Sequence, residues 1–320
     1  MVIIHMLTHL VFVPKLVKDK KLAGQMAILA TAVLMSTNGL FIKLLVWHPV
    51  VITCLRSLLA AVFLLIVRLA VPPPKGFKNP PFAFWAAGIT FAATMFAFVI
   101  ANKLTTAANA IMLQYSSPIW AALLGWWLIK EKPHWEHWAA LVLVFGGLVL
   151  FFRDGLGRGA FLGDALALFS GFLYGVQSVF LRMMKDGNPR DAMLLAHVIC
   201  AVVGIPFVFI YPPSISVSST LSILYMGTIQ IGLASLLFAY GLKRISAVQA
   251  MLIAVVEPIL NPVWVMAITG EKPSATAIAG GAIIIAAVIA SSLIGKRREE
   301  HALALLISKS RERRGLGTRP

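Results

Sequence analysis

Glu257 is the acidic residue that lies deepest in an apolar stretch of this sequence, the stretch 246–268. About eleven residues separate it from each end, so a membrane helix here would place its carboxyl group near the bilayer midplane. A carboxylic acid at this depth takes up a proton or pairs with a cation. Glu257 is therefore a candidate proton-linked or cation-linked site, and the alternative is a structural acid hydrogen-bonded to a neighbouring helix.

Prolines interrupt two of the apolar stretches near their middles, at Pro118 and Pro258, and Pro262 follows one turn after the second. A proline inside a helix has no N–H, so the carbonyl groups of Gln114 and Ala254 lose their usual donor. We therefore expect helix breaks at Pro118, Pro258 and Pro262. Broken helices at matching places in two halves of a membrane protein indicate a binding site, and the alternative is a kink that only shapes packing.

Arg56 lies about six residues, or roughly 9 Å of helix, inside the apolar stretch 50–71. At that depth it requires a partner or a water-filled cavity. It is either a donor that holds neighbouring helices together or an anchor for a substrate carboxylate. Amide and hydroxyl groups in other stretches could line the same cavity. The candidate substrate-binding residues are Asn38, Arg56, Gln114, Tyr115, Gln177, Tyr240, Glu257 and Asn261.

Other chemistries find little support in the residue pattern. His134 and His137 with Glu131 resemble a loose set of metal ligands, but the HExxH order is absent. The sequence also has no phosphate-binding loop, no GxSxG nucleophile turn and no CxxC pair. We therefore expect no metal, no cofactor and no enzymatic activity, and we expect the ligand to be a small-molecule substrate.

Membrane helices must position these residues, because 59% of the chain is hydrophobic, 12% is charged and the mean hydropathy is +0.88. Ten stretches approach the length of about 20 residues that a spanning helix needs. They are 22–46, 50–71, 82–103, 106–129, 136–152, 162–184, 192–211, 219–242, 246–268 and 276–295. None alternates like a β-barrel strand, so we expect an all-α integral membrane protein with ten transmembrane helices.

The chain also repeats itself, because residues 101–150 align with residues 241–290 without a gap. Pro118 then aligns with Pro258. Two halves of five helices each, an odd number, must enter the membrane in opposite directions, so we expect two inverted five-helix repeats, as in many secondary transporters. The expected divisions are an N-terminal tail 1–21, a first repeat 22–152, a linker 153–161, a second repeat 162–295 and a basic C-terminal tail 296–320.

The net charge of +16 follows from 28 Lys and Arg residues that are unevenly distributed. Most of them fall in the two tails and in the loops expected on the same side as the tails. The positive-inside rule therefore predicts cytoplasmic termini in an inner (cytoplasmic) membrane, with the basic segments facing anionic lipids. No nucleic-acid-reading motif accompanies the charge, so we expect no nucleic-acid partner.

Residues 255–262 (VVEPILNP) and 270–273 (GEKP) resemble the stretch that closes a repeat in the EamA family of the drug/metabolite transporter superfamily. The first half has a weaker copy at 116–118 (SSP) and 130–133 (KEKP), and 55–61 (LRSLLAA) is similar to that family's second helix. The resemblance implies ten helices in two inverted repeats, with helices 1–4 and 6–9 around a central cavity and helices 5 and 10 outside it. It also implies export, exchange or uptake of small metabolites or drug-like compounds.

The leading hypothesis is a secondary transporter that moves a small organic metabolite, amino acid-like or drug-like, by alternating access around a midplane site. The alternative is a passive channel or facilitator, although channels use continuous rings of like polar groups and the two halves differ in theirs. A non-transporting membrane scaffold is less favoured, because duplicated helix breaks have no evident use in it. The substrate, the direction of flux, protons as coupling ion and a homodimer as the assembled form are left open.

Overall fold

The computed structural model describes residues 19–38, 41, 45–71, 81–105, 107–153, 161–260, 264 and 274–313, and over these residues the protein is all-helical. The first half of the chain forms α2 (Lys20–Ser36), α4 (Pro49–Ala70), α5 (Phe82–Leu104), α6 (Ala107–Gln114), α7 (Ser117–Ile129) and α8 (Trp135–Phe152). The second half forms α9 (Phe161–Met183), α10 (Pro189–Ile210), α11 (Val217–Tyr225), the π-helix η3 (Met226–Leu233), α12 (Ala234–Leu242), α13 (Ala247–Ala254) and α15 (Ala275–Arg313).

Six helices in these described ranges are long and apolar enough to cross a membrane. They cover Pro49–Ala70, Phe82–Ala101, Phe161–Met183, Pro189–Ile210, Val217–Leu242 and Ile278–Gly295, and shorter apolar helices cover Trp135–Phe151 and Ala247–Leu260. Large apolar side chains such as Leu69 and Phe209 are exposed, as lipid-facing residues are. The expected all-α, multi-pass membrane class is therefore confirmed, whereas the expected number of ten transmembrane helices stays a prediction.

Side chains that cap the first N–H groups set where several helices begin. Asp19 accepts hydrogen bonds from the N–H groups of Lys21 at 2.8 Å and Leu22 at 3.3 Å, at the start of α2. Ser246 accepts one from the N–H of Gln249 at 3.3 Å, at the start of α13. α4 and α10 each begin with a proline, whose missing N–H would have no helical acceptor at that position.

The two halves of the chain are interleaved in the middle of the bundle. α9 packs against α5, α6 and α7, while α10 packs against α4 and α5. α12 packs against α2, and η3 packs against α4. One large buried apolar cluster contains residues of both halves, among them Ile28, Phe91, Val179 and Met251. Polar side chains that point into this shared interior are therefore supplied by both halves.

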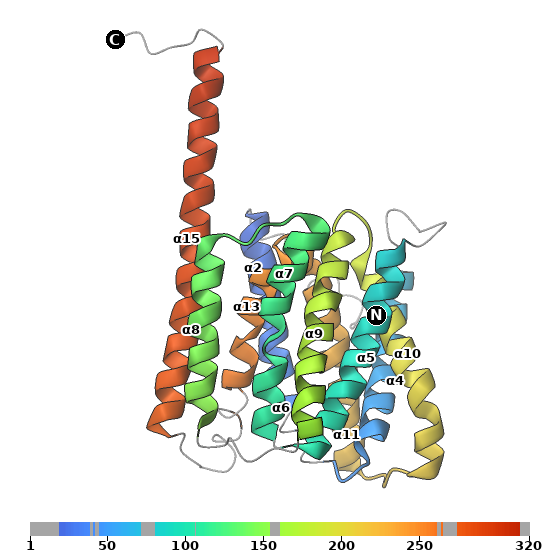
Figure 1. Ribbon diagram of the computed structural model, residues 1–320. Coiled ribbons are helices and arrows are strands. Elements are labelled where there is room, and N and C mark those ends of the chain that lie inside the picture. The colour runs from blue at the N-terminus through green and yellow to red at the C-terminus, as the bar shows by residue number, and fades with distance from the viewer. Residues whose placement is uncertain are drawn as a thin grey trace.

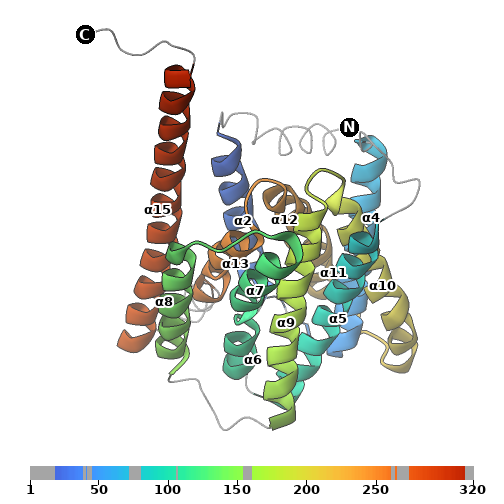
Figure 2. The ribbon, with the colours of Figure 1, turned by 45° about the horizontal axis from the view of Figure 1, so that its top comes forward.

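α8 and α15 form a pair at one side of the bundle (Figures 1 and 2). Two glycines permit their close approach, because a Cβ at Gly147 would lie 3.0 Å from the carbonyl oxygen of Gly280. α15 continues as one helix beyond the rest of the bundle (Figure 1). Residues 296–313, part of the expected C-terminal tail, are thus helical.

The directions of the helices can be read at one end of the bundle, where a single cavity is lined by residues from several helix ends. Lys20 at the start of α2 and Ser246 just before α13 line this cavity. Lys130 just after α7 and Arg182 near the end of α9 line it as well. At this end of the bundle, then, α2 and α13 begin while α7 and α9 finish.

Candidate functional site

The two interrupted helices of the bundle meet at Tyr115 and Glu257. Tyr115 and Ser116 form the turn that separates α6 from α7. Val255 forms the turn that separates α13 from the helical residues 256–260, which carry Glu257. The hydroxyl group of Tyr115 and the carboxyl group of Glu257 form a side-chain hydrogen bond. The break in one half of the chain is therefore bonded directly to the break in the other half.

The backbone of α9 lies directly against the first break. A Cβ at Gly171 would lie 2.7 Å from the carbonyl oxygen of Gln114 and 2.7 Å from Ser116 Oγ. A Cβ at Gly175, one turn further along, would lie 2.9 Å from the carbonyl oxygen of Ser117. Only a helix face without side chains fits this close to the interrupted backbone. The Gly171-x-x-x-Gly175 pattern thus serves helix packing at the break.

Arg56 is buried among groups that leave its positive charge unneutralised. Its side chain is 5% exposed, and its Nη1 donates to Asn38 Oδ1 at 3.1 Å. Its Nη2 lies 3.6 Å from the sulfur of Met95, and its Nε has no partner. In the described part of the chain no carboxylate pairs with Arg56. The structure thus brings together two of the expected site residues, Asn38 and Arg56, and keeps a guanidinium donor available.

The π-helix η3 supplies a buried amide beside the same end of α2. Gln230 Nε2 donates to Thr37 Oγ1 at 2.9 Å, and Gln230 Oε1 has no partner. Gly227 lets η3 approach α4, because a Cβ there would lie 2.9 Å from the carbonyl oxygen of Arg56. π-Helical turns are rare and occur frequently at functional sites.

His197 on α10 is a second ionisable group of this interior. Its Nε2 lies 3.0 Å from Ser235 Oγ, and its ring packs edge-on against Phe91 at 5.4 Å between centroids. Its Nδ1 has no partner, and the ring lies within electrostatic range of Arg56. We call Thr37, Asn38, Arg56, His197 and Gln230 the central polar cluster. Four segments that both halves supply contribute to it, namely the end of α2, α4, α10 and η3.

Several polar atoms in and near the central polar cluster are buried without a hydrogen-bond partner. They are Arg56 Nε, Gln177 Oε1, His197 Nδ1 and Gln230 Oε1. Each buried polar atom without a partner costs about 1–3 kcal/mol. Because buried polar atoms are normally hydrogen-bonded, these atoms indicate a place that a polar ligand or water completes.

The remaining expected site residues are placed as follows. Gln177 is fully buried, and its Nε2 lies 3.5 Å from the sulfur of Met193, while Gln114 ends α6 half-buried. Tyr240 lies apart from the cluster, because its ring is 3.3 Å from the guanidinium carbon of Arg244. Burial lowers the pKa of Arg244, which lies in a loop outside the membrane helices.

Of the three expected helix breaks, Pro118 and Pro258 lie among the described residues. Pro118 lies in the first turn of α7, and Pro258 is buried in the helical residues 256–260. Asn261 and Pro262 lie outside the described residues. No group of three or more His, Cys, Asp or Glu side chains within the described ranges could hold a metal ion.

Sequence reasoning did not select three groups that the structure places at the site. His197 and Gln230 belong to the cluster, and Tyr174 lies close enough to Glu257 for an electrostatic interaction. His197 is an ionisable residue inside the apolar stretch 192–211, so its depth alone was an available signal. No signal in the sequence separates Gln230 and Tyr174 from polar residues that only hold helices together.

Comparison with known proteins agrees with this architecture. The profile of the EamA-like transporter family matches residues 22–153 and 161–293. The uncharacterized transporter YwfM of Bacillus subtilis is 26% identical over 211 residues, covering 63% of this chain and 70% of YwfM. An uncharacterized transporter of Archaeoglobus fulgidus is 24% identical over 267 residues, covering 83% of this chain and 95% of the relative.

A solved crystal structure shares the fold, with a TM-score of 0.74 at 20% sequence identity, and the match covers 87% of this chain and 99% of that chain. The likeness in fold extends over most of both chains. The family profile matches both halves of the sequence. On this evidence, the chain belongs to the EamA-like transporter family.

Proposed function

We propose that this protein is a secondary transporter that moves a small organic solute, amino acid-like or drug-like, across the cytoplasmic membrane by alternating access. The observation that carries the proposal is the hydrogen bond between Tyr115 and Glu257, which joins the broken helix of each half. Broken helices at the interface of two repeats are the usual location of a transporter's site. Movement of one half against the other would remake this contact and expose the site to each side in turn.

The proposed topology is ten transmembrane helices in two inverted repeats with both termini in the cytoplasm. The opposite directions of α2 and its repeat equivalent α9 support it, because α2 begins where α9 ends. The interrupted helix α6–α7 and its equivalent, which begins with α13, are related in the same way, because α7 ends at the cavity where α13 begins. Lys20 and Arg298 line the same cavity, which supports an even number of crossings between them. The basic residues at this end favour the cytoplasmic side.

The central polar cluster is the proposed binding site. The unneutralised guanidinium of Arg56 is suited to a substrate carboxylate, since arginine binds carboxylates through a planar set of donors. The unpartnered oxygens of Gln177 and Gln230 are acceptors for an amine or hydroxyl of the same solute. A solute with an acidic group and a hydrogen-bond donor would therefore pair with the Arg56 guanidinium and also bond to these unpartnered amide oxygens.

The test is countertransport of labelled amino acids into liposomes that contain the purified protein, with and without a pH gradient. Saturable exchange that unlabelled substrate on the far side accelerates is expected of alternating access. Flux that neither saturates nor exchanges would instead assign the chain to channels or facilitators. A protein that binds and moves no solute, tested also with drug-like cations, would overturn the transport proposal.

Glu257 is the proposed coupling residue, with protons as the coupling ion. Glu257→Gln removes the ionisable group but keeps an amide able to accept from Tyr115, so the fold is expected to survive. Exchange driven by a pH gradient is expected to disappear in this variant. Asp186→Asn is the matched control, because Asp186 is exposed in the turn between α9 and α10. Equal gradient-driven flux in both variants would reduce Glu257 to a structural acid.

A further inference from the structure

A cavity of about 760 Å³ opens at the end of the bundle where α2 begins and α9 finishes. We call this cavity the basic pocket, and it is separate from the central polar cluster. Its lining includes Lys20, Lys130, Lys132, Arg182, Gln249 and Arg298, which both halves of the chain supply. None of its lining residues belongs to the central polar cluster.

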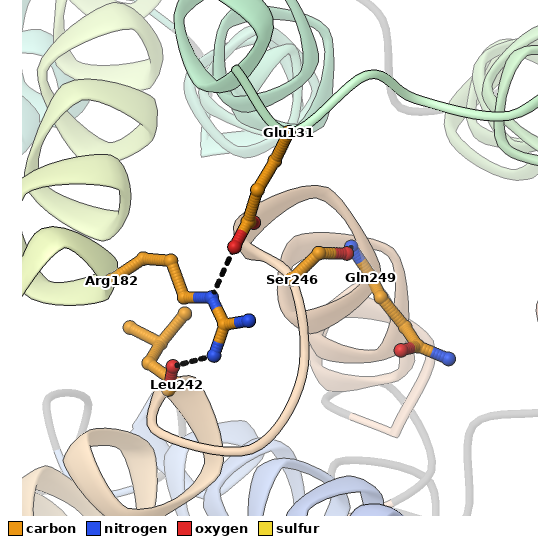
Figure 3. A network of polar contacts seen from close by, with 5 residues as sticks. All are labelled: Glu131, Arg182, Leu242, Ser246 and Gln249. Carbon is orange, nitrogen blue, oxygen red and sulfur yellow. Dashed lines mark hydrogen bonds and ion pairs between the residues drawn. The ribbon is translucent and has the colours of Figure 1, made fainter. Parts of the chain in front are cut away.

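Each carboxylate group at the basic pocket has at least one partner, while the second oxygen of Glu131, Oε2, is buried without one. Glu131 Oε1 accepts from Arg182 Nε at 2.8 Å (Figure 3). Asp19 accepts from N–H groups at the start of α2. Glu136, beside the pocket, lies 2.9 Å from Nη1 of Arg298. Asp19 and Glu131 are the acidic residues of the lining, against seven lysines and arginines, so the lining keeps an excess of positive charge.

Lys20, Lys130 and Lys132 are the free cations of the basic pocket. All three are exposed, and within the described ranges none forms an ion pair or a side-chain hydrogen bond. Lys130 ends α7 in the left-handed region at φ 58°, where helices usually place glycine or asparagine. Lysine is uncommon in this conformation.

Gln249 adds a side-chain amide that has no partner among the described residues. The residue is 7% exposed and lines the basic pocket, yet its side-chain amide bonds to nothing in the described part of the chain. In Figure 3 its amide extends away from the Glu131–Arg182 ion pair. Gln249 lies in the first turn of α13, whose N-terminus adds backbone N–H groups and the positive end of the helix dipole.

We propose that the basic pocket binds a phosphate group, with Lys20, Lys130, Lys132 and the amide of Gln249 as its donors. Cations on several segments around one cavity suit a multiply charged anion better than a single carboxylate. The phosphate belongs to a free phosphate compound or to the headgroup of an anionic lipid, since both present the same charged oxygens. Either ligand would contact both halves of the chain at once.

The test is isothermal titration of pyrophosphate, and separately of inorganic phosphate, into the full-length protein in phosphatidylcholine nanodiscs. The variants are Lys130→Ala/Lys132→Ala and Gln249→Ala. Lys185→Ala is the matched control, because Lys185 is an exposed lysine near the end of α9 that does not line the pocket. We expect the affinity for pyrophosphate to fall at least tenfold in the double variant, less in Gln249→Ala, and not in the control.

A parallel arm compares melting temperatures in nanodiscs with and without phosphatidylglycerol. If neither soluble anion binds but phosphatidylglycerol stabilises the protein through the same lysines, the site is confirmed as a lipid headgroup site. If chloride at equal ionic strength has the effect of pyrophosphate, or if the control variant loses as much as the double variant, the proposal is overturned. Absence of any phosphate or lipid effect overturns it as well. These readouts do not depend on transport, so failure of the transport proposal leaves them interpretable.

Discussion

At the scale of single residues, Arg56 is the group whose chemistry is most constrained by its surroundings. It is buried, its only polar side-chain partners in the described part of the chain are Asn38 and the sulfur of Met95, and one of its nitrogens bonds to nothing. A buried cation without an acid beside it is costly unless something else supplies the negative charge. A substrate carboxylate is the partner that transport would bring and release.

Two substitutions of Asn38, the partner of Arg56, test this interpretation, because they are expected to change the affinity for a carboxylate substrate differently. Asn38→Asp would place a carboxylate 3.1 Å from the guanidinium, so we expect the apparent affinity for a carboxylate substrate to fall about tenfold or more, which is about 1.4 kcal/mol. Asn38→Ala would leave the guanidinium freer, and we expect affinity to be kept or raised. Substrate titration of countertransport measures both. Equal affinities in all three proteins would make Arg56 a packing donor.

The hydrogen bond between the two helix breaks is open to a double-mutant cycle. Tyr115→Phe removes the donor and Glu257→Ala removes the acceptor, and thermal unfolding in detergent gives the free energy of each variant and of the double variant. We expect a coupling free energy of about 0.5–2 kcal/mol, as for other hydrogen bonds between membrane helices. Additive losses would mean that the two side chains do not interact.

Residue types in the sequence indicated which side chains are unusual, but not which of them meet. Arg56 and Glu257 stand out because charge is rare inside apolar stretches. Their partners, Asn38 and Tyr115, come from other helices, and the choice depends on packing that periodicity does not specify. Tyr240 illustrates the limit, because a tyrosine in an apolar stretch is equally compatible with the interior and with its actual place beside Arg244.

At the scale of helices, the sequence anticipates apolar segments well because length and composition alone define them. It does not anticipate η3, since a π-helix depends on how Gly227 and Gly232 pack against α4 and not on residue preference. It also does not show that the helix of α15 continues to Arg313, where polar residues follow an apolar span. The form of η3 and the length of α15 therefore depend on how these helices pack against their neighbours.

The approach of α9 to the first break yields a prediction about glycine. Gly171→Ala would place a methyl group 2.7 Å from the carbonyl oxygen of Gln114, so the helices must separate, and we expect a loss of about 1–3 kcal/mol in stability. Gly146→Ala in α8 is the control, because nothing lies within 4 Å of a Cβ there. Thermal unfolding of both variants in detergent decides the matter. Equal stability would show that α9 does not abut the break this closely.

At the scale of the whole molecule, the two halves are joined at the basic pocket by an ion pair between a loop of the first half and α9 of the second. Arg182 donates from Nε to Glu131 Oε1 at 2.8 Å and from Nη1 to the carbonyl oxygen of Leu242 at 3.0 Å (Figure 3). Because Glu131 lies on a short loop and not on a packed helix face, this ion pair has few neighbouring contacts to replace it. An alternating-access protein would have to release such a pair whenever this end opens.

Reversing one charge of this pair should therefore favour the state in which the pocket end is open. In Glu131→Lys two cations face each other, and we expect a membrane-impermeant thiol reagent to label Gln249→Cys at least about tenfold faster, which corresponds to about 1.4 kcal/mol. Adding Arg182→Glu restores opposite charges and should return labelling to its original rate. Asp191→Asn is the control: its ion pair with Arg68 at 3.1 Å joins α4 and α10, helices that already pack along each other. If the charge swap fails to restore slow labelling, or the control accelerates it equally, the pair does not hold this end closed.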